Sequence, residues 1–352
     1  MSLAVASVAS HSALDVFDGA KDEGLRTIAI CRKGRERIYT ACRETIDRCL
    51  VLSDYKEMVS PEIQERLIED NSVIVPNRSM AVYVGYTPIE RDLRVPVFGN
   101  KFLLRWEERT GDKNYYRLLD DARVRRPASW RVEEARTDTP LILKIQESGR
   151  PQERAFIIAS NKDDLYSKIS DALRRGIIEE EQLRDAVAEE LVLGAHFNIN
   201  YFYSVARGRL EILSIDRRIQ SNLDGLLHLP ARHQLQLEMP VSMVEVGHMP
   251  ATLRESLLEE AYSMGERFVE ASRRLEPPGV IGPFTLQLLV TPDLQLIVYD
   301  VATRIGGGTN AHMGIGGQYS KLFLRKPVST GRRIAIELKE LDREGRLSEA
   351  LT

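Results

Sequence analysis

Cysteine is scarce in this sequence of 352 residues, with only three, Cys31, Cys42 and Cys49. Their odd number and the absence of a C-x-x-C pair are typical of a reducing compartment and argue against a structural zinc site. The sequence also has no run of eighteen apolar residues, and its start, MSLAVASVAS, is too short for a signal peptide and lacks a basic head. We therefore expect a cytoplasmic protein with no membrane partner.

An excess of positive charge is missing too, since 49 lysines and arginines face 52 aspartates and glutamates. The net charge of −3 gives no broad basic field, and no basic patch with interleaved aromatic residues stands out, so nucleic acid is not an expected partner. With 43% hydrophobic and 29% charged residues the composition is globular. The length predicts two or three packed units that share a cleft.

Strands and helices alternate over the first part of the chain. The strand LAVASVAS is followed by a helix through Ala20, which Gly24 ends, and by the strand TIAIC. The strand RCLVL, a helix with Pro61 in its first turn and the strand SVIVP continue this order. The alternation predicts a Rossmann-like parallel sheet with helices on its faces over residues 1–98.

Polar residues follow two strands of this predicted sheet. His11 and Ser12 come after the first strand, and Ser79 comes after a later one. Ligands of parallel sheets bind beyond the carboxyl ends of the strands, where helix N-terminal amides also favour anions. The three residues are therefore candidates for substrate contacts. The alternative is that Ser10 or Ser12 only caps the helix and that His11 is an exposed loop residue.

Residues 99–187 are predicted to form a small α+β lid. PLILKIQ is a strand that carries Lys144, and RAFIIAS is its expected hairpin partner. NKDDLYSKISDALRRG is a helix that ends at Gly176. The arginine-rich stretch that precedes them is expected to be a solvated, ion-paired face.

Residues 188–352 are predicted to form a third unit around a second sheet. HFNINYFYS and RLEILSID are two of its strands, and a long amphipathic helix ends at Pro277-Pro278-Gly279. FTLQLLV and LQLIVYD form a hairpin with its turn at Pro292-Asp293.

Gln287 and Asp300 lie on the two arms of that hairpin. With the turn near 291–294, their side chains can face the same side, where an amide oxygen and a carboxylate could share one hard cation. The alternative is a pair of solvated polar residues on the open face of the hairpin.

The segment RIGGGTN, residues 304–310, follows the hairpin. Arg304, the amides of residues 306–308 and the pair Thr309-Asn310 provide the donors that a phosphate or acyl phosphate needs beside a metal. The alternative is that the glycines only permit a tight turn. Lys144 could meet the phosphates of a nucleotide, and the exposed backbone of Leu191 and Val192 could bind an adenine edge.

The order of these features resembles the ATP-grasp carboxylate–amine ligases. SHSALDVFDGAKDEG, VPVFGNK, LRWE, DRRIQSNLDGLLHLPA, PPGVIGPFTLQ and RIGGGTN are similar to the archaeal formate-dependent 5-formaminoimidazole-4-carboxamide ribonucleotide synthetases, and the resemblance spans essentially the whole chain. It implies an ATP-grasp fold of α/β and α+β parts, with the N-terminal Rossmann-like domain, a small lid subdomain and a C-terminal mixed-sheet catalytic domain.

The resemblance also implies an activity, which is formylation of aminoimidazole carboxamide ribonucleotide by formate through formyl phosphate, in purine (IMP) biosynthesis. It implies ATP and Mg²⁺ or Mn²⁺ as cofactors and a homo-oligomer. Gln287 and Asp300 match the metal ligands, and Arg304 and Lys144 match the catalytic positions. The ATP positions are Lys144, Glu189, Glu190, Leu191, Val192 and Gln220, and the substrate positions are His11, Ser12, Ser79, His248, Gly307, Gly308, Thr309 and Asn310.

Some positions depart from the pattern of this family. QESGRPQERAF has only Gly149 where a glycine-rich phosphate loop is usual, and NRS at 77–79 replaces His-Gly-Ser. Asp300 and Gln220 stand where glutamate is usual, and His248 where asparagine is usual. Two hypotheses therefore stay open. One is an active ligase with this or another acceptor or acid, and the other is a nucleotide-binding sensor or partner subunit without turnover.

Overall fold

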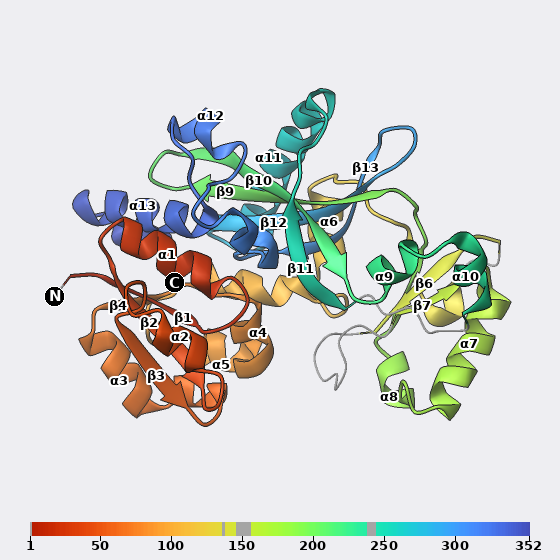
Figure 1. Cartoon of the computed structure of the whole chain (residues 1–352), viewed down its shortest axis with the longest axis horizontal. Helices are drawn as coiled ribbons and strands as arrows, with labels where there is room; N and C mark the ends of the chain where they lie inside the picture. Colours follow the sequence, from red (N-terminus) through yellow and green to blue (C-terminus); the bar gives the residue numbers. More distant parts are fainter. Residues whose placement is uncertain (1, 136–137, 146–155, 238–243) are drawn as a thin grey trace.

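Three β-sheets organise the chain in the computed structural model, which describes residues 2–135, 138–145, 156–237 and 244–352. Each sheet comes from its own stretch of sequence, as the colours of Figure 1 show. The N-terminal sheet and the small lid sheet lie at opposite ends of the molecule, and the third, central sheet lies between them. No described helix combines the length and apolar character needed to cross a membrane.

The N-terminal sheet has the strand order β3-β2-β1-β4, and all its pairings are parallel, which confirms the prediction. Its central strand β1 is buried at each position, because small and apolar residues fill both faces. The elements of this part are β1 (Ala4–Val8), α1 (Ala13–Asp22), β2 (Arg26–Arg32), α2 (Arg37–Ala41), β3 (Arg48–Leu52), α3 (Pro61–Glu69), β4 (Ser72–Ile74), α4 (Arg78–Val84) and α5 (Tyr86–Arg91).

The lid sheet has the order β5-β8-β6-β7 and is antiparallel at every described pairing. Lys144 pairs with Phe156, so the predicted hairpin is confirmed. The predicted division into three domains stays a proposal, and its boundary at residue 187 falls on the first residue of β8. The elements of this part are α6 (Tyr115–Asp121), β5 (Ser129–Arg131), β6 (Leu141–Lys144), β7 (Phe156–Ala159), α7 (Lys162–Arg174), α8 (Glu180–Leu183) and β8 (Val187–Glu190).

The central sheet has the order β11-β10-β9-β12-β13, and its described pairings are all antiparallel, where the resemblance implied a mixed sheet. Successive residues of β9 face opposite sides, since Tyr201 packs with Phe268 of α11 and Phe202 packs with Ile334 of α13. The elements are β9 (Ala195–Ser204), β10 (Arg209–Gln220), α9 (Leu223–Leu227), α10 (Ala231–Gln236), β11 (Glu245–Pro250), α11 (Leu258–Leu275), β12 (Gly282–Val290), β13 (Leu296–Ala302), α12 (Ser320–Leu324) and α13 (Thr330–Arg343).

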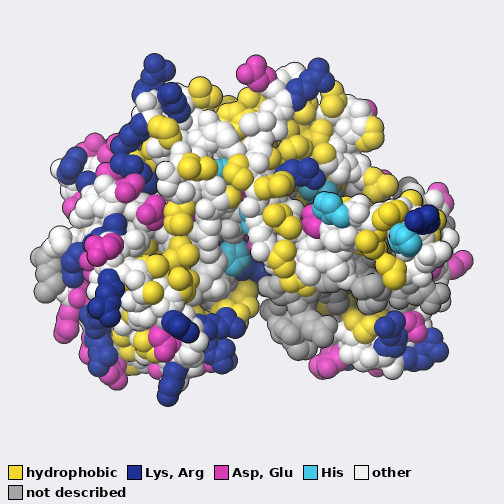
Figure 2. Space-filling view, viewed as in Figure 1, with side chains coloured by type: hydrophobic (Ala, Val, Ile, Leu, Met, Phe, Trp, Pro, Cys, Tyr) yellow, Lys and Arg dark blue, Asp and Glu magenta, His cyan; other side chains and the backbone are white. Residues whose placement is uncertain are grey.

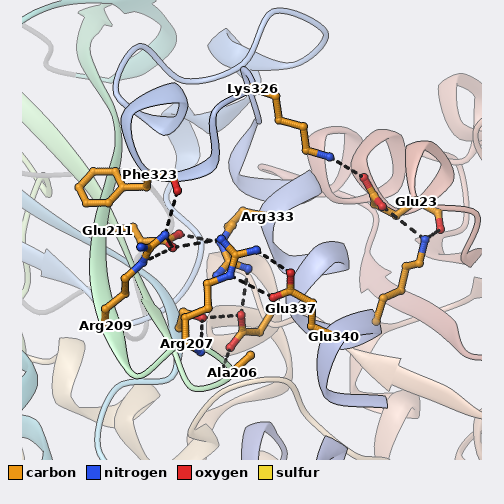
Figure 3. Close-up of polar contacts among 12 residues, drawn as sticks. Glu23, Ala206, Arg207, Arg209, Glu211, Phe323, Lys326, Arg333, Glu337 and Glu340 are labelled. Atoms are coloured by element: carbon orange, nitrogen blue, oxygen red, sulfur yellow. Dashed lines mark hydrogen bonds and ion pairs between the residues drawn. The ribbon is translucent and has the colours of Figure 1, made fainter. Parts of the chain in front are cut away.

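A buried ion cluster ties α13 to the central sheet (Figure 3). Arg333 Nε lies 2.7 Å from Glu211 Oε2 of β10, and its Nη1 lies 2.9 Å from Glu337 Oε2 one helical turn later. All three side chains are fully buried. Glu337 also accepts hydrogen bonds from the Ser204 hydroxyl and the Ala206 N–H, each at 2.8 Å. Arg333 therefore balances the charge of Glu337 and shares the neutralisation of Glu211 with Arg209.

Replacement of Arg333 by methionine is expected to lower the free energy of unfolding by about 3–5 kcal/mol, because the buried carboxylate of Glu337 loses the cation that contacts it and Glu211 keeps only the partly exposed Arg209 and Arg207. Guanidinium denaturation followed by circular dichroism measures this change. The matched control is Arg346→Met, since the ion pairs of Arg346 with Glu344 and Glu349 are exposed and contribute little. Equal midpoints for Arg333→Met and the wild-type protein would contradict the stabilising role of the cluster.

Candidate active site

A row of polar side chains crosses the central sheet. Asp216 of β10 pairs with Asn198 of β9, Asn198 pairs with Gln287 of β12, and Gln287 pairs with Asp300 of β13. Paired positions on neighbouring strands point to the same face, so the four side chains lie side by side. Asn198, Gln287 and Asp300 line the main cavity, while Asp216 is fully buried at the end of the row. The predicted juxtaposition of Gln287 and Asp300 is confirmed.

A β-bulge brings Asp300 into this row. Leu288 pairs with Val298 and Gln287 pairs with Asp300, so Tyr299 is an extra residue on β13. In a regular hairpin Gln287 would oppose Tyr299, and Asp300 would point to the other face of the sheet. The bulge therefore places the Gln287 amide and the Asp300 carboxylate on the same face of the central sheet.

The main cavity lies between the central sheet and the N-terminal part of the chain. His11 and Arg78 line it from the N-terminal part, and Arg218, Glu245 and His248 line it from β10 and β11. A second hollow continues from it along His11, Arg78, Glu245 and His248. Figure 2 shows the groove on this face of the molecule, with a histidine side chain visible inside it.

Gln287 and Asp300 suit a hard divalent cation. Gln287 Oε1 is buried and has no hydrogen-bond partner among the described residues, although a buried amide oxygen normally has one. Asp300 faces the same cavity and is only half-buried. No group of three or more histidine, cysteine, aspartate or glutamate residues in the described part of the chain could hold a metal ion. A metal here would therefore share its coordination with oxygens of a bound substrate.

The glycines at 306–308 let the backbone approach the site closely. A Cβ atom at Gly306 would overlap the Thr285 hydroxyl, one at Gly307 would overlap the His11 ring, and one at Gly308 would overlap the Asp216 carboxylate. The backbone dihedral angles of these three glycines are not left-handed, so it is space and not a turn conformation that requires them. The alternative of a glycine loop that only permits a tight turn is therefore wrong.

Replacement of Gly308 by alanine is expected to lower the free energy of unfolding by about 1–3 kcal/mol, because the methyl group displaces the Asp216 carboxylate or the loop. The ATP-dependent activity that the resemblance implies should fall with it, since Gly308 lines the main cavity. Thermal denaturation and a phosphate-release assay measure the two effects. Gly225→Ala in α9, where a Cβ would meet nothing within 4 Å, is the matched control and should keep both properties. A Gly308→Ala protein with wild-type stability would contradict the close approach.

Arg304 projects into the cavity from the segment after β13. Its Nη2 lies 3.0 Å from Glu107 Oε2, and its Nη1 donates to the Ile305 carbonyl at 3.0 Å. Its Nε is buried and has no hydrogen-bond partner among the described residues. Burial raises the pKa of Glu107, and the charge of Arg304 opposes this effect. The guanidinium is thus held in a fixed orientation and still has a donor to offer to an anion.

His11 is held in the left-handed backbone region, with φ at 57°, and it lines the cavity beside Gly307. Non-glycine residues in this region are strained and are often found at functional sites. Burial, together with the charge of Arg304, lowers the pKa of His11 to about 3. The imidazole is therefore neutral near pH 7. The alternative that His11 is an exposed loop residue is wrong, because the side chain is partly buried.

A second cavity lies between the lid sheet and the central sheet. Its walls are mostly apolar, as is typical of a slot that takes a planar base. Gln220 and the whole predicted linker from Glu189 to Val192 line it. The Leu191 N–H, however, donates to the Pro140 carbonyl at 2.9 Å, so the prediction that this N–H is exposed is wrong. The apolar residues of the wall are Pro127, Ile142, Phe156, Ile158, Leu191, Val192, Leu193, Leu223 and Leu289.

Lys144 lies at the floor of this second cavity. Its Nζ is 2.6 Å from Glu189 Oε2 and donates to the Tyr299 carbonyl at 3.0 Å. The bulge leaves that carbonyl outside the sheet pairing. Glu189 also accepts a short hydrogen bond from the Tyr116 hydroxyl. Burial lowers the pKa of Lys144, and Glu189 opposes this effect. The amine is thus pre-positioned by Glu189 and the Tyr299 carbonyl, and Tyr116 in turn holds Glu189.

Asp300 and Arg218 line both cavities. The two cavities therefore meet at a carboxylate and a guanidinium. Groups bound in the two cavities would therefore approach each other beside these two side chains.

Three of the predicted substrate residues hold the loops together, and a fourth lies in a helix. Ser12 is fully buried and donates a short hydrogen bond to the Gly306 carbonyl, and it makes no helix-capping hydrogen bond, so the capping alternative is wrong for Ser12. Thr309 is also fully buried and donates to the same carbonyl at 3.4 Å. Asn310 donates to the His11 carbonyl at 2.8 Å. Ser79 is buried in α4, beside Arg78.

Several residues that line the cavity were not predicted from the sequence. Arg78, Arg218 and Glu245 belong to no short motif, and only the fold brings them to the site. Asn198 and Asn200 alternate within the otherwise apolar strand HFNINYFYS, and this alternation could have marked one polar face. Residues 146–155 of the segment QESGRPQERAF, which include Gly149, lie outside the described residues.

The fold and the site together define an ATP-grasp carbon–nitrogen ligase. N5-carboxyaminoimidazole synthetase from Staphylococcus aureus has the same fold, with a TM-score of 0.62 at 12% identity over 94% of this chain and 77% of that one. Family models described as "Protein of unknown function (DUF1246)" and "Domain of unknown function (DUF1297)" match residues 5–130 and 164–352.

More similar proteins narrow the assignment. A 5-formaminoimidazole-4-carboxamide-1-(beta)-D-ribofuranosyl 5'-monophosphate synthetase from Methanopyrus kandleri is 40% identical over 99% of this chain and 95% of its own length. The relative of the same name from Methanothermobacter thermautotrophicus is 38% identical, with 99% and 94% covered. The IMP biosynthesis protein PurP from Thermococcus kodakaraensis superimposes with a TM-score of 0.76 at 30% identity, over 99% of this chain and 100% of that one. The chain belongs to this synthetase family.

Proposed function

We propose that this chain joins formate to the exocyclic amine of 5-aminoimidazole-4-carboxamide ribonucleotide, with conversion of ATP to ADP and phosphate. The names of its relatives describe the product of that reaction. The observation that carries the proposal is that two cavities, one apolar under the lid and one polar with three arginines, meet at Asp300 and Arg218. This arrangement suits transfer of a phosphoryl group from a nucleotide in one cavity to an acid in the other.

ATP would bind in the slot under the lid. The apolar wall would enclose the adenine, and Glu190, Leu191, Val192 and Gln220 would line its edge. Lys144 would meet the phosphates, because its amine lies at the floor of the slot and is already oriented by Glu189. Three solved structures with this fold are complexes with ADP, which supports nucleotide binding by a protein of this fold.

A divalent cation, Mg²⁺ or Mn²⁺, would be held by Gln287 and Asp300 together with the ATP phosphates. The unpaired Oε1 of Gln287 and the adjacent carboxylate of Asp300 are oxygen donors of the kind that these ions prefer. When bound, such a cation neutralises the negative charge of the transferring phosphoryl group. Arg304 would add its guanidinium on the other side of that group.

Formate is a poor electrophile, and the site would activate it in two steps. A formate oxygen attacks the γ-phosphorus of ATP, the bond from that phosphorus to the β–γ bridging oxygen breaks, and formyl phosphate and ADP result. The ribonucleotide amine then attacks the formyl carbon, phosphate leaves, and the amine loses a proton. The close contact of the loop 306–308 with His11 and Asp216 would keep water away from the reactive acyl phosphate. Gly307, Gly308, His11 and His248 would line the acceptor side.

Phosphate release from ATP and Mg²⁺ tests the proposal. We expect release that depends on both formate and the aminoimidazole carboxamide ribonucleotide, with formation of the formylated product detected by mass spectrometry. ATP binding without release, measured by calorimetry and thermal shift, would contradict the ligase and favour a nucleotide-binding protein. Phosphate release with formate and a different amine would contradict the proposed acceptor but not the ligase reaction. A homo-oligomer in the cytoplasm is part of the same proposal.

A further inference from the structure

Asp216 is fully buried beneath the main cavity and receives three side-chain donors. Asn198 Nδ2 donates to its Oδ2 at 2.7 Å, and Asn200 Nδ2 donates to its Oδ1 at 2.7 Å. His248 Nδ1 lies 2.6 Å from Oδ2. All three donors belong to residues that line the main cavity. A single buried carboxylate thus contacts three side chains of the cavity wall.

The carboxylate fixes the orientation of both amides. Because a carboxylate only accepts hydrogen bonds from such partners, each amide turns its nitrogen toward Asp216 and its oxygen away. The amide oxygen of Asn200 does point away from Asp216, since its Oδ1 accepts a hydrogen bond from the Thr285 hydroxyl at 2.8 Å. Thr285 lines the cavity as well. The donors and acceptors presented to a substrate therefore depend on a residue that the substrate does not reach.

The same carboxylate helps to hold His248 as a cation. The Nε2 of His248 lies 2.9 Å from Glu245 Oε1, so each ring nitrogen faces a carboxylate. Burial alone would lower the pKa of His248, but the contacts with Asp216 and Glu245 raise it to about 9. The other titratable groups around the imidazole are Arg218, His11 and His312. His312 is buried and its lowered pKa leaves it neutral, so Asp216 and Glu245 supply the balancing negative charge.

A chain of alternating charge leads from Asp216 to the junction of the cavities. His248 contacts Glu245, and Glu245 Oε2 lies 2.9 Å from Arg218 Nε. Arg218 also pairs directly with His248 across β10 and β11. Arg218 is one of the two residues common to both cavities. The sequence of charges is negative, positive, negative, positive, so a change at its buried end alters each contact up to Arg218.

We propose that Asp216 is a positioning residue of the ligase reaction, which orients Asn198, Asn200 and His248 for the acceptor. Through His248 and Glu245 it also sets Arg218 at the junction of the two cavities. Gly308 packs closely against the same carboxylate, so Asp216 contacts both the glycine loop and the cavity wall. This inference rests on the proposed function, and it adds a residue that does not itself touch the substrate.

Asp216→Asn tests this role, because the amide keeps the shape of the side chain and removes its charge. We expect the kcat/KM for the ribonucleotide to fall about tenfold or more, as for other residues that orient groups of a site, while the Kd for ATP stays at the wild-type value. The pH profile should change as well. His248 is charged below its pKa, so activity that needs the cation is present below about pH 9 and is lost as the pH rises through this value. Without the charge of Asp216 this loss should move to lower pH.

Glu211→Gln is the matched control. Glu211 lies on the same strand, is also fully buried, and contacts Arg333 rather than the cavity. It should lower thermal stability and leave the kcat/KM and the pH profile unchanged. Wild-type kcat/KM and an unchanged pH profile in Asp216→Asn would overturn the inference, as would equal kinetic effects in the two variants.

His248→Gln keeps the inference testable if Asp216→Asn does not fold. We expect it to lose the alkaline change in kcat/KM together with most of the activity toward the ribonucleotide. A wild-type pH profile in this variant would also overturn the inference. A wild-type protein that releases no phosphate would instead contradict the proposed function, so the two failures are distinguishable.

Discussion

Replacement of Asp300 by alanine is expected to reduce formate-dependent phosphate release on the order of a thousandfold, to the background of the assay. Asp300 is the charged member of the pair with Gln287, and it stands where the two cavities meet. In the proposed site a divalent cation would then keep only the neutral Gln287 as a protein ligand, and the cation that neutralises the transferring phosphoryl group would be lost. Steady-state phosphate release at increasing Mg²⁺ measures the effect, and excess Mg²⁺ should not restore activity.

Asp293→Ala provides the matched control for this variant. Asp293 is exposed at the tip of the same hairpin and accepts a hydrogen bond from the Thr291 hydroxyl, far along the strand from the site. Its removal should leave turnover at the wild-type rate. Calorimetry adds a readout that does not need turnover, since Asp300→Ala should weaken ATP binding only when Mg²⁺ is present. Full turnover by Asp300→Ala would exclude the assignment of this carboxylate as a metal ligand.

Replacement of Arg304 by lysine is expected to lower kcat about 10²–10³-fold with little change in the KM for ATP. The guanidinium contacts Glu107 and the Ile305 carbonyl and still has Nε to offer, whereas an ammonium ion cannot hold this set of directions at once. The effect should appear in kcat because, in the proposed reaction, Arg304 stabilises negative charge that develops during phosphoryl transfer. Single-turnover kinetics with saturating ATP and formate separate this step from binding.

Arg91→Lys is a suitable control for this variant, since Arg91 is exposed at the end of α5. It should show wild-type kcat and KM. A rise in the KM for ATP with an unchanged kcat in Arg304→Lys would show that Arg304 binds the nucleotide in the ground state and does not act on the transferring group.

Local patterns in the sequence were sufficient for most of the secondary structure. The parallel N-terminal sheet follows from alternating strands and helices, and the lid hairpin follows from two apolar runs, with Lys144 opposite Phe156. Pro61 begins α3 as predicted, because its fixed φ suits the first turn of a helix. Signals of this kind act over a few residues, so a single sequence carries them.

The sequence analysis correctly predicts that Gln287 and Asp300 point to the same face, but the bulge that causes this arrangement is not evident from the sequence. A regular hairpin with this turn would have placed them on opposite faces, and the bulge at Tyr299 corrects the alternation. No residue type in LQLIVYD requires a bulge at that position. The prediction left the exact position of the turn open within 291–294. The one-residue shift that brings the two side chains together lies instead in strand β13.

The contacts made by Asp216 and Arg304 could not be predicted from local patterns. His248 is 32 residues from Asp216, and Glu107 is 197 residues from Arg304. Such pairs depend on how sheets and loops pack, which a single sequence does not encode at any fixed spacing. For the same reason Ser12 was expected to contact a substrate, whereas its hydroxyl donates to the Gly306 carbonyl.

The bulge also limits how the length of this chain can vary. Side chains alternate along a strand, so one residue inserted or deleted between Gln287 and Asp300, within either arm, would reverse the facing of Asp300. Loss of Tyr299 would in addition remove the carbonyl that accepts from Lys144, so both cavities would be damaged by one deletion. The exposed tip at 292–294 tolerates extra residues without altering either pairing. Insertions and deletions in related chains should therefore be confined to this tip.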